Sequence, residues 1–313
     1  MSTASTYNID TFLLNTGDNF YWCGIQNTSD FQINADFVKP YDELNLPFYS
    51  ILGNHEYGYN VSAQLDYANM NPKWIMDDRY YTRRFELVTS AGTTAYASII
   101  FLDTSPCVTG YRSSNSANWD PCSSDYPTCS FDSTDDDFEG ECQFNANINS
   151  QNCQTQYDWF VSALAAVPAD DWLIVMGHHP LDEVNFVDFV APLVSHGFGI
   201  YINGHSHTLA QYTIDKAGAW VTTGAGSLVD TTDQLSYNTA KKVRGENIDV
   251  EDMRNAPEGM STTHTYQTVF NSYTAGFTMH EFNSDFSQLT TSFVSYTGSV
   301  LHSFVVNKDG SLV

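Results

Sequence analysis

The chain has 313 residues, a length that suits a large domain with a sizeable core, and its 42% hydrophobic content is typical of a globular protein rather than a disordered one. Its 12 basic and 37 acidic side chains give a net charge of −25, which argues against nucleic acid as a partner, because that binding needs a broad basic surface. No apolar run approaches the ~18 residues that a membrane span needs.

Four short apolar segments, at 11–15, 47–52, 172–176 and 198–203, have the length and composition of buried strands. Each runs into a turn led by glycine that then presents Asp, Asn or His. These turns contain Gly17-Asp18, Gly53-Asn54, Gly177-His178 and Gly204-His205. Helical patterns at 156–167 and 186–194 separate the strands and predict a largely parallel sheet. In such sheets ligands bind beyond the carboxyl ends of the strands, so we expect the four turns to meet there.

The cysteines gather in one stretch, because five of the six lie between Cys107 and Cys153. None forms a zinc-finger spacing, so residues 104–155 are interpreted as a disulfide-stapled insertion, which indicates an oxidising compartment. The sequence does not choose among the possible pairings. Two glycosylation tripeptides, at Asn27 and Asn60, fit a secreted protein.

The rest of the chain completes a single predicted domain over residues 1–313. From Gly276 onward, short alternating runs predict further strands that form a second sheet. No linker forces a domain split. The acidic run Asp135–Asp137 is interpreted as a solvated loop, with calcium binding as the alternative.

The candidate metal ligands combine carboxylate, phenolate, carboxamide and imidazole groups. They are Asp18, Tyr21, Asn54, His178, His205 and His207. A set without cysteine disfavours a structural zinc site and suits Fe, Mn or Zn in a reactive one. His205 and His207 are two residues apart in an extended segment, so their rings can point the same way and serve one metal each. Asp18, with two oxygens, is the natural bridge.

Each residue also has a simpler interpretation. A lone histidine is more often structural, Asp18 could cap a helix, Tyr21 could pack in the core, and His55 could only orient Asn54. The ordered set of four turns favours the ligand roles. Glu56 and His179 are expected to support the ligands, and Asp103 to have a structural hydrogen-bonding role.

The four turns resemble, in this order, successive motifs of the purple acid phosphatases, and most of all the small tartrate-resistant type within the calcineurin-like metallophosphoesterases. The motifs are GDNFY at 17–21, GNHE at 53–56, GHHP at 177–180 and GHSH at 204–207; weaker agreement lies at 60–64, 74–81, 102–104 and 224–227. The resemblance spans nearly the whole chain apart from the Cys-rich insertion. It implies an α/β fold of two mixed β-sheets packed face to face and flanked by helices.

The resemblance also implies a role for each ligand. Asp18 would bridge two metals, Tyr21 and His207 would bind Fe(III), and His55 would assist the leaving group. The second ion, Fe(II), Zn(II) or Mn(II), would be held by Asn54, His178 and His205.

The implied activity is hydrolysis of phosphate monoesters by a metal-bound hydroxide, with an acid optimum. Its substrates would be small phosphate esters or phosphoproteins. The implied location is secreted, lysosomal or vacuolar.

Two features depart from the family pattern. Family members begin with a strand ending in Asp-x-Gly that supplies another ferric ligand; the chain shows none, and Asp10 would lie ~26 Å along the strand from Asp18. Residues 1–10 also have neither the basic nor the apolar region of a signal segment. Both observations lead to the hypothesis that the chain starts inside a longer gene product, and its first strand is expected to be lacking. The loop Leu181–Asn185 lacks the further substrate-facing histidine of the family, so protonation of the leaving group rests more on His55.

Two alternatives to the phosphomonoesterase stay open at this point. One is a phosphodiesterase or pyrophosphatase on the same metal core, because the pocket walls decide the substrate. The other is a non-catalytic secreted protein that keeps the fold after losing the first aspartate ligand.

Overall fold

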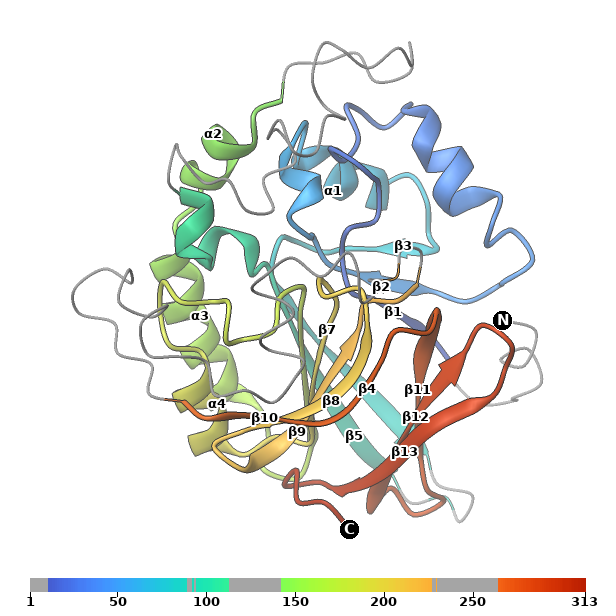
Figure 1. Ribbon diagram of the computed structural model, residues 1–313, viewed down its shortest axis with the longest axis vertical. Coiled ribbons are helices and arrows are strands. Elements are labelled where there is room, and N and C mark those ends of the chain that lie inside the picture. Colours follow the sequence, from blue (N-terminus) through green and yellow to red (C-terminus); the bar gives the residue numbers. More distant parts are fainter. Residues whose placement is uncertain (1–10, 89–91, 93, 113–141, 227–228, 230–263) are drawn as a thin grey trace. The chain divides into compact units, whose positions relative to one another are not determined.

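The computed structural model describes residues 11–88, 92, 94–112, 142–226, 229 and 264–313 (Figure 1). The chain divides into two compact units. Unit 1 comprises Met1–Tyr81 and Asp103–Asn152, and unit 2 comprises Thr82–Leu102 and Cys153–Val313. The acidic run Asp135–Asp137 lies outside the described residues, and the single predicted domain stays a prediction.

Unit 1 contains a parallel three-stranded sheet in the order β1–β2–β3. The strands are β1 (Leu13–Asn15), β2 (Phe48–Ser50) and β3 (Trp74–Ile75). Aromatic side chains fill the core of the unit: the ring centroids of Phe37 and Trp74 are 4.8 Å apart, and those of Phe37 and Phe48 are 5.1 Å apart. This packing explains why short strands hold here, since each large ring buries far more apolar surface than an aliphatic side chain. The first two predicted strands are thereby confirmed.

Unit 1 also contains six short helices among its described residues. They are η2 (Ile33–Val38), η3 (His55–Tyr57), α1 (Ser62–Ala68), η4 (Ser105–Cys107), η5 (Thr109–Arg112) and α2 (Phe144–Asn149). The last three lie in the predicted insertion, whose described parts are therefore more regular than a stapled loop. In α2, Phe144 and Ile148 are one helical turn apart and both buried, which gives this helix an apolar face. Cys23, Cys107, Cys142 and Cys153 are disulfide-bonded, as the composition predicts.

Unit 2 is built on a mixed seven-stranded sheet in the order β10–β8–β9–β7–β6–β5–β4 (Figure 1). The strands are β4 (Tyr81–Val88), β5 (Thr94–Leu102), β6 (Trp172–Gly177), β7 (Ile200–Asn203), β8 (Leu209–Ile214), β9 (Ala217–Thr223) and β10 (Tyr266–Ser272). Strands β5, β6, β7 and β9 are parallel. Every residue of β6 and β7 is buried, which accounts for their continuous apolar sequences.

A smaller antiparallel sheet packs on the large one within unit 2. It consists of β11 (Gly276–Phe282), β12 (Gln288–Ser295) and β13 (Val300–Asn307), the alternating runs predicted near the C-terminus. Contacts across the sheets include Trp172 against Phe282, with ring centroids 5.0 Å apart, and Phe270 against Phe293 at 5.1 Å. The predicted α/β class with packed sheets is confirmed, with the large sheet mixed and the small one antiparallel.

Helices α3 (Cys153–Ala166) and α4 (Val190–His196) complete unit 2. α4 begins four residues later than its apolar pattern predicts, because the Asp188 carboxylate accepts hydrogen bonds from the N–H groups of Val190 and Ala191, at 2.9 and 3.0 Å. Pro192 then falls in the first turn, where its missing N–H costs no helical hydrogen bond. Among the described residues, no helix combines the length and apolarity required to cross a membrane.

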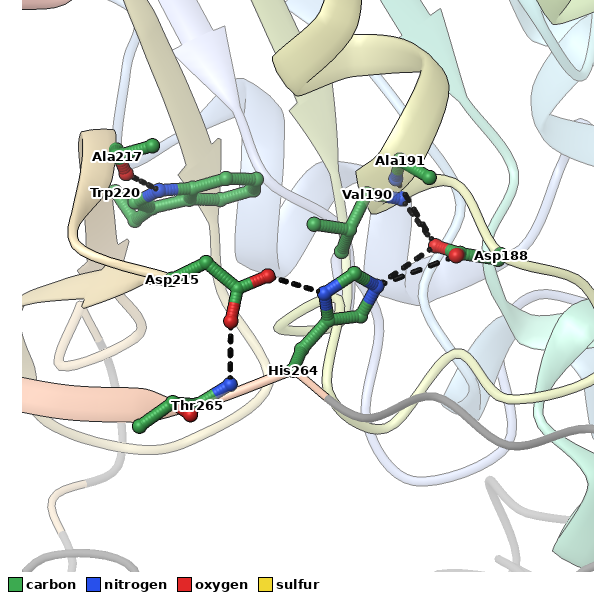
Figure 2. Close-up of polar contacts among 8 residues, drawn as sticks. All are labelled: Asp188, Val190, Ala191, Asp215, Ala217, Trp220, His264 and Thr265. Carbon is green, nitrogen blue, oxygen red and sulfur yellow. Dashed lines mark hydrogen bonds and ion pairs between the residues drawn. The ribbon is translucent and has the colours of Figure 1, made fainter.

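His264 links three elements of unit 2, as Figure 2 shows. Its Nδ1 lies 2.5 Å from an oxygen of Asp215, in the turn between β8 and β9, and its Nε2 lies 3.1 Å from Asp188. Both ring nitrogens can donate only if the imidazole is protonated. Burial lowers the pKa of His264, but the hydrogen bonds to the two carboxylates outweigh it and raise this pKa above its ordinary value.

Candidate metal centre

The oxygen donors follow two paired strands of unit 1. Asn15, the last residue of β1, pairs with Ser50, the last residue of β2, so the turns that carry Asp18 and Asn54 leave the sheet at the same edge. The sequence predicts this arrangement for all four turns on one largely parallel sheet, because carboxyl ends of parallel strands share an edge. The structure instead divides the four strands between two sheets, with β1 and β2 in one and β6 and β7 in the other.

Asp18 lies at the centre of these oxygen donors. One carboxylate oxygen accepts a hydrogen bond from the N–H of His55 at 3.0 Å, and the other accepts one from the Tyr21 hydroxyl at 3.2 Å. Its φ of 53° is in the left-handed region. Asp215 and Lys216 share that conformation in the turn between β8 and β9, where a two-residue turn requires it. Asp18 is not part of a two-residue hairpin turn. Residues with a strained backbone of this kind cluster at functional sites.

Glu56 holds the two turns together. Its carboxylate is buried and accepts four backbone N–H groups: those of Gly53 and Asp18 on one oxygen, at 2.6 and 3.0 Å, and those of Asn19 and Phe20 on the other, at 2.7 and 3.2 Å. Hydrogen bonds to an ionised acceptor are the strong ones in proteins. The expected supporting role of Glu56 is therefore one of fixing the backbone.

Gly53 allows the turns to approach each other. A Cβ at this position would lie 2.1 Å from a carboxylate oxygen of Asp18 and 2.4 Å from its backbone nitrogen. Any side chain here would displace Asp18, so the glycine is required by the contact itself.

His55 has a fixed orientation. Its Nδ1 lies 2.5 Å from the carbonyl oxygen of Trp22, which only accepts, so Nδ1 carries a proton. The ring packs against Tyr21, with centroids 4.4 Å apart. In the neutral ring this leaves Nε2 as the nitrogen with a lone pair.

A buried polar group anchors the short helix η3 that contains His55. The Tyr57 hydroxyl donates to Asp103 at 2.5 Å, and Arg79 contacts both residues, with its Nε 3.1 Å from the Asp103 carboxylate. Burial, followed by the charge of Asp103, raises the pKa of Tyr57, so its hydroxyl stays a donor. The hydrogen-bonding role predicted for Asp103 is present.

The nitrogen donors follow two paired strands of unit 2. Met176 pairs with Ile202, so β6 and β7 end together, and Gly204 N–H donates to the carbonyl oxygen of His178 at 2.9 Å. Asn203, which sequence analysis did not single out, fixes the end of β7: its amide donates to Thr222 at 3.0 Å and its oxygen accepts the Tyr212 hydroxyl at 2.8 Å.

Three histidines form a tight group at this edge. One ring nitrogen from each of His178, His179 and His205 lies within 4.8 Å of the others, and Nε2 of His178 is 3.3 Å from Nδ1 of His205. Two nitrogens bound to one tetrahedral ion at ~2.0–2.1 Å would lie about 3.3–3.4 Å apart. The spacing and the donor chemistry therefore fit a divalent cation. His205, like Asp18, has a left-handed φ, here 59°.

His179 belongs to this group, whereas His207 does not. From the sequence, His179 is expected only to support the ligands, and His205 and His207 are expected to serve one metal each. His179 joins the group because the chain bends at His178 and His179 after β6 ends. The position of His207 outside the group agrees with its expected assignment to the other metal, which stays a prediction.

Gly224 and Glu183 complete the surroundings of the histidines. A Cβ on Gly224 would lie 2.0 Å from the carbonyl oxygen of Ser206, so this glycine allows β9 to end against the His205 turn. Glu183 places a carboxylate oxygen 3.2 Å from Nε2 of His205. One acidic residue among 37 carries no signal in the sequence, and only the fold reveals this contact.

Comparisons with known proteins identify the family of the chain. The family model described as calcineurin-like phosphoesterase matches residues 3–209, which include all six candidate ligands. The chain belongs to the calcineurin-like phosphoesterase family. It is 30% identical to the tartrate-resistant acid phosphatase type 5 of Oryctolagus cuniculus over 71% of this chain and 63% of that one. It is 26% identical to purple acid phosphatase 7 of Arabidopsis thaliana over 69% and 60%.

Solved structures support the same fold. GAP50, the anchor in the inner membrane complex of Plasmodium, covers 95% of this chain with a TM-score of 0.61 and 20% identity, over 78% of its own length. The yellow lupin purple acid phosphatase PPD1 covers 95% with a TM-score of 0.52 and 13% identity, over 46% of its length. At these identities the likeness shows the fold alone. The chain spans less than two thirds of the length of the phosphatases from rabbit, mouse and rat.

Proposed function

We propose that this member of the calcineurin-like phosphoesterase family is an acid phosphatase that hydrolyses phosphate monoesters at a dinuclear metal centre. The observation that carries the proposal is the pair of imidazole nitrogens 3.3 Å apart on His178 and His205, in turns that the family model covers. The proposed ligands are Asp18, Tyr21, Asn54, His178, His205 and His207.

Asp18, Tyr21 and His207 suit a hard ion such as Fe(III). Asn54, His178 and His205 suit Fe(II), Zn(II) or Mn(II). When bound, two such ions would supply the positive charge that a phosphate ester needs in a chain with a net charge of −25. The chain's own residues would then orient the ester and move protons. His55 is proposed to protonate the leaving oxygen from Nε2 when its ring is in the protonated imidazolium form, because Nδ1 already donates to Trp22.

A secreted, lysosomal or vacuolar location is part of the proposal. The disulfide-bonded cysteines favour an oxidising compartment. The side chains of Asn27 and Asn60, the two expected glycosylation sites, are exposed.

The test compares a phosphate monoester with a diester, p-nitrophenyl phosphate and bis(p-nitrophenyl) phosphate, on the chain loaded with iron and zinc at pH 5. We expect turnover of the monoester, its loss in His178→Ala, and no change in His196→Ala, which removes an exposed histidine at the end of α4. Faster turnover of the diester would replace the proposal by the phosphodiesterase alternative. No turnover of either ester with both metals bound would support the non-catalytic one.

A further inference from the structure

Glu183 contacts the outer nitrogen of a proposed metal ligand. Its carboxylate oxygen is 3.2 Å from Nε2 of His205, and the His205 side chain is only 6% exposed. A carboxylate accepts hydrogen bonds and cannot donate them, so the proton of a neutral His205 ring lies on Nε2.

This contact determines which nitrogen of His205 can bind a cation. With the proton on Nε2, the lone pair is on Nδ1, and Nδ1 is the atom that lies 3.3 Å from Nε2 of His178. Only the tautomer with its proton on Nε2 presents a lone pair to His178.

The loop after β6 is folded so that Glu183 reaches this position. Glu183 N–H donates to the carbonyl oxygen of Pro180 at 3.0 Å, which closes a turn. Leu181 and Val184 are buried on either side and fix the loop to the core, while Asp182 and Glu183 remain partly exposed. His205 itself lies in a bend with a left-handed backbone, outside any helix or strand.

We propose that Glu183 is a positioning residue of the histidine group: it sets the tautomer and ring plane of His205, so that Nδ1 of His205 and Nε2 of His178 face one divalent cation. This inference rests on the proposed metal binding, and it adds Glu183 as the carboxylate that supports His205. Carboxylates behind metal-bound histidines typically change metal affinity by ~10–100-fold.

The main experiment measures Zn²⁺ affinity by isothermal titration calorimetry on the full chain after chelation of its metals. We expect Glu183→Ala to weaken binding by ~10–100-fold and Glu183→Gln to restore part of it, because the amide oxygen accepts the same hydrogen bond. Asp182→Asn, which removes the neighbouring charge, is the matched control and should leave affinity unchanged. Equal weakening by Glu183→Ala and Asp182→Asn would overturn the inference, because charge alone would then explain the effect.

A second measurement separates this inference from the proposed function. Long-range ¹H–¹⁵N NMR spectra of the metal-free chain report the tautomer of each histidine. We expect His205 to carry its proton on Nε2 in the wild type and to become a mixture of tautomers in Glu183→Ala. The same tautomer in both proteins would overturn the role of Glu183 even if zinc binds. Failure of the wild type to bind zinc, with the expected tautomers, would count against the proposed function alone.

Discussion

The oxygen donors of unit 1 and the histidine group of unit 2 each have a supporting carboxylate, but the two carboxylates do different things. Glu56 is 1% exposed and accepts four backbone N–H groups from two turns. The Glu183 side chain is 21% exposed and contacts a ring nitrogen. Glu56 therefore fixes the backbone around the oxygen donors, whereas Glu183 orients one side chain of the histidine group. Mutations in the first should lower stability, whereas mutations in the second should change binding at nearly constant stability.

The largest effect is expected for Glu56→Gln. The amide NH₂ of glutamine would face backbone N–H groups, so at least one pair of buried donors would lose its acceptor, at ~1–3 kcal/mol for each donor. We expect the free energy of unfolding to fall by about 3–5 kcal/mol, measured by urea denaturation. Glu43→Gln, at an exposed glutamate of the same unit, should stay within about 0.5 kcal/mol. A loss at Glu56 as small as that control would show that the turns hold without its charge.

Gly53→Ala should come next. Its Cβ would meet the backbone nitrogen of Asp18, which cannot move aside as a flexible side chain would. Overpacking of this kind costs about 1–3 kcal/mol, and it should also weaken iron binding, because Asp18 moves. The control is Gly110→Ala, where the new Cβ would have no atom within 4 Å. Calorimetric unfolding of both variants decides the matter: similar melting temperatures for the two would mean that the turn adapts to the methyl group.

The smallest effect on stability is expected for His264→Gln, away from the candidate metal ligands of both units. Because the pKa of His264 is raised in the folded chain, its contribution to stability is full below the unfolded pKa of ~6.5 and is lost as pH rises through the folded pKa. We expect the substitution to lower the melting temperature by about 1–3 °C at pH 5 and by less at pH 9. A decrease that is equal at both pH values would show that the two carboxylates do not depend on the charge of the ring. His196→Gln, in which the histidine contacts a backbone carbonyl, is the control.

Sequence patterns predict the strands and the position of the ligands better than the details of the ligand group. The β6 and β7 segments are continuous apolar runs that end in glycine or asparagine, and such runs can hardly form anything but buried strands. The start of α4 could not be predicted from periodicity. It is set by the Asp188 carboxylate, which accepts hydrogen bonds from the first N–H groups of the helix.

The same limit applies to the candidate site. The pairing of the Asp18 and Asn54 turns follows from the strand register and could be expected. Three other features depend on bends and loops that leave no periodic pattern in the sequence. They are the position of His179 beside His178 and His205, the contact of Glu183 with His205, and the four hydrogen bonds of Glu56.

The most direct test of the account is the number of metal ions that the chain binds when it is saturated with iron and zinc. Mass spectrometry of the metals, normalised to protein, should give two ions per chain in the wild type, and fewer in Asp18→Asn because the proposed bridge loses its charge. A wild-type chain that holds one ion or none at saturation would contradict the dinuclear centre on which the proposed phosphatase rests.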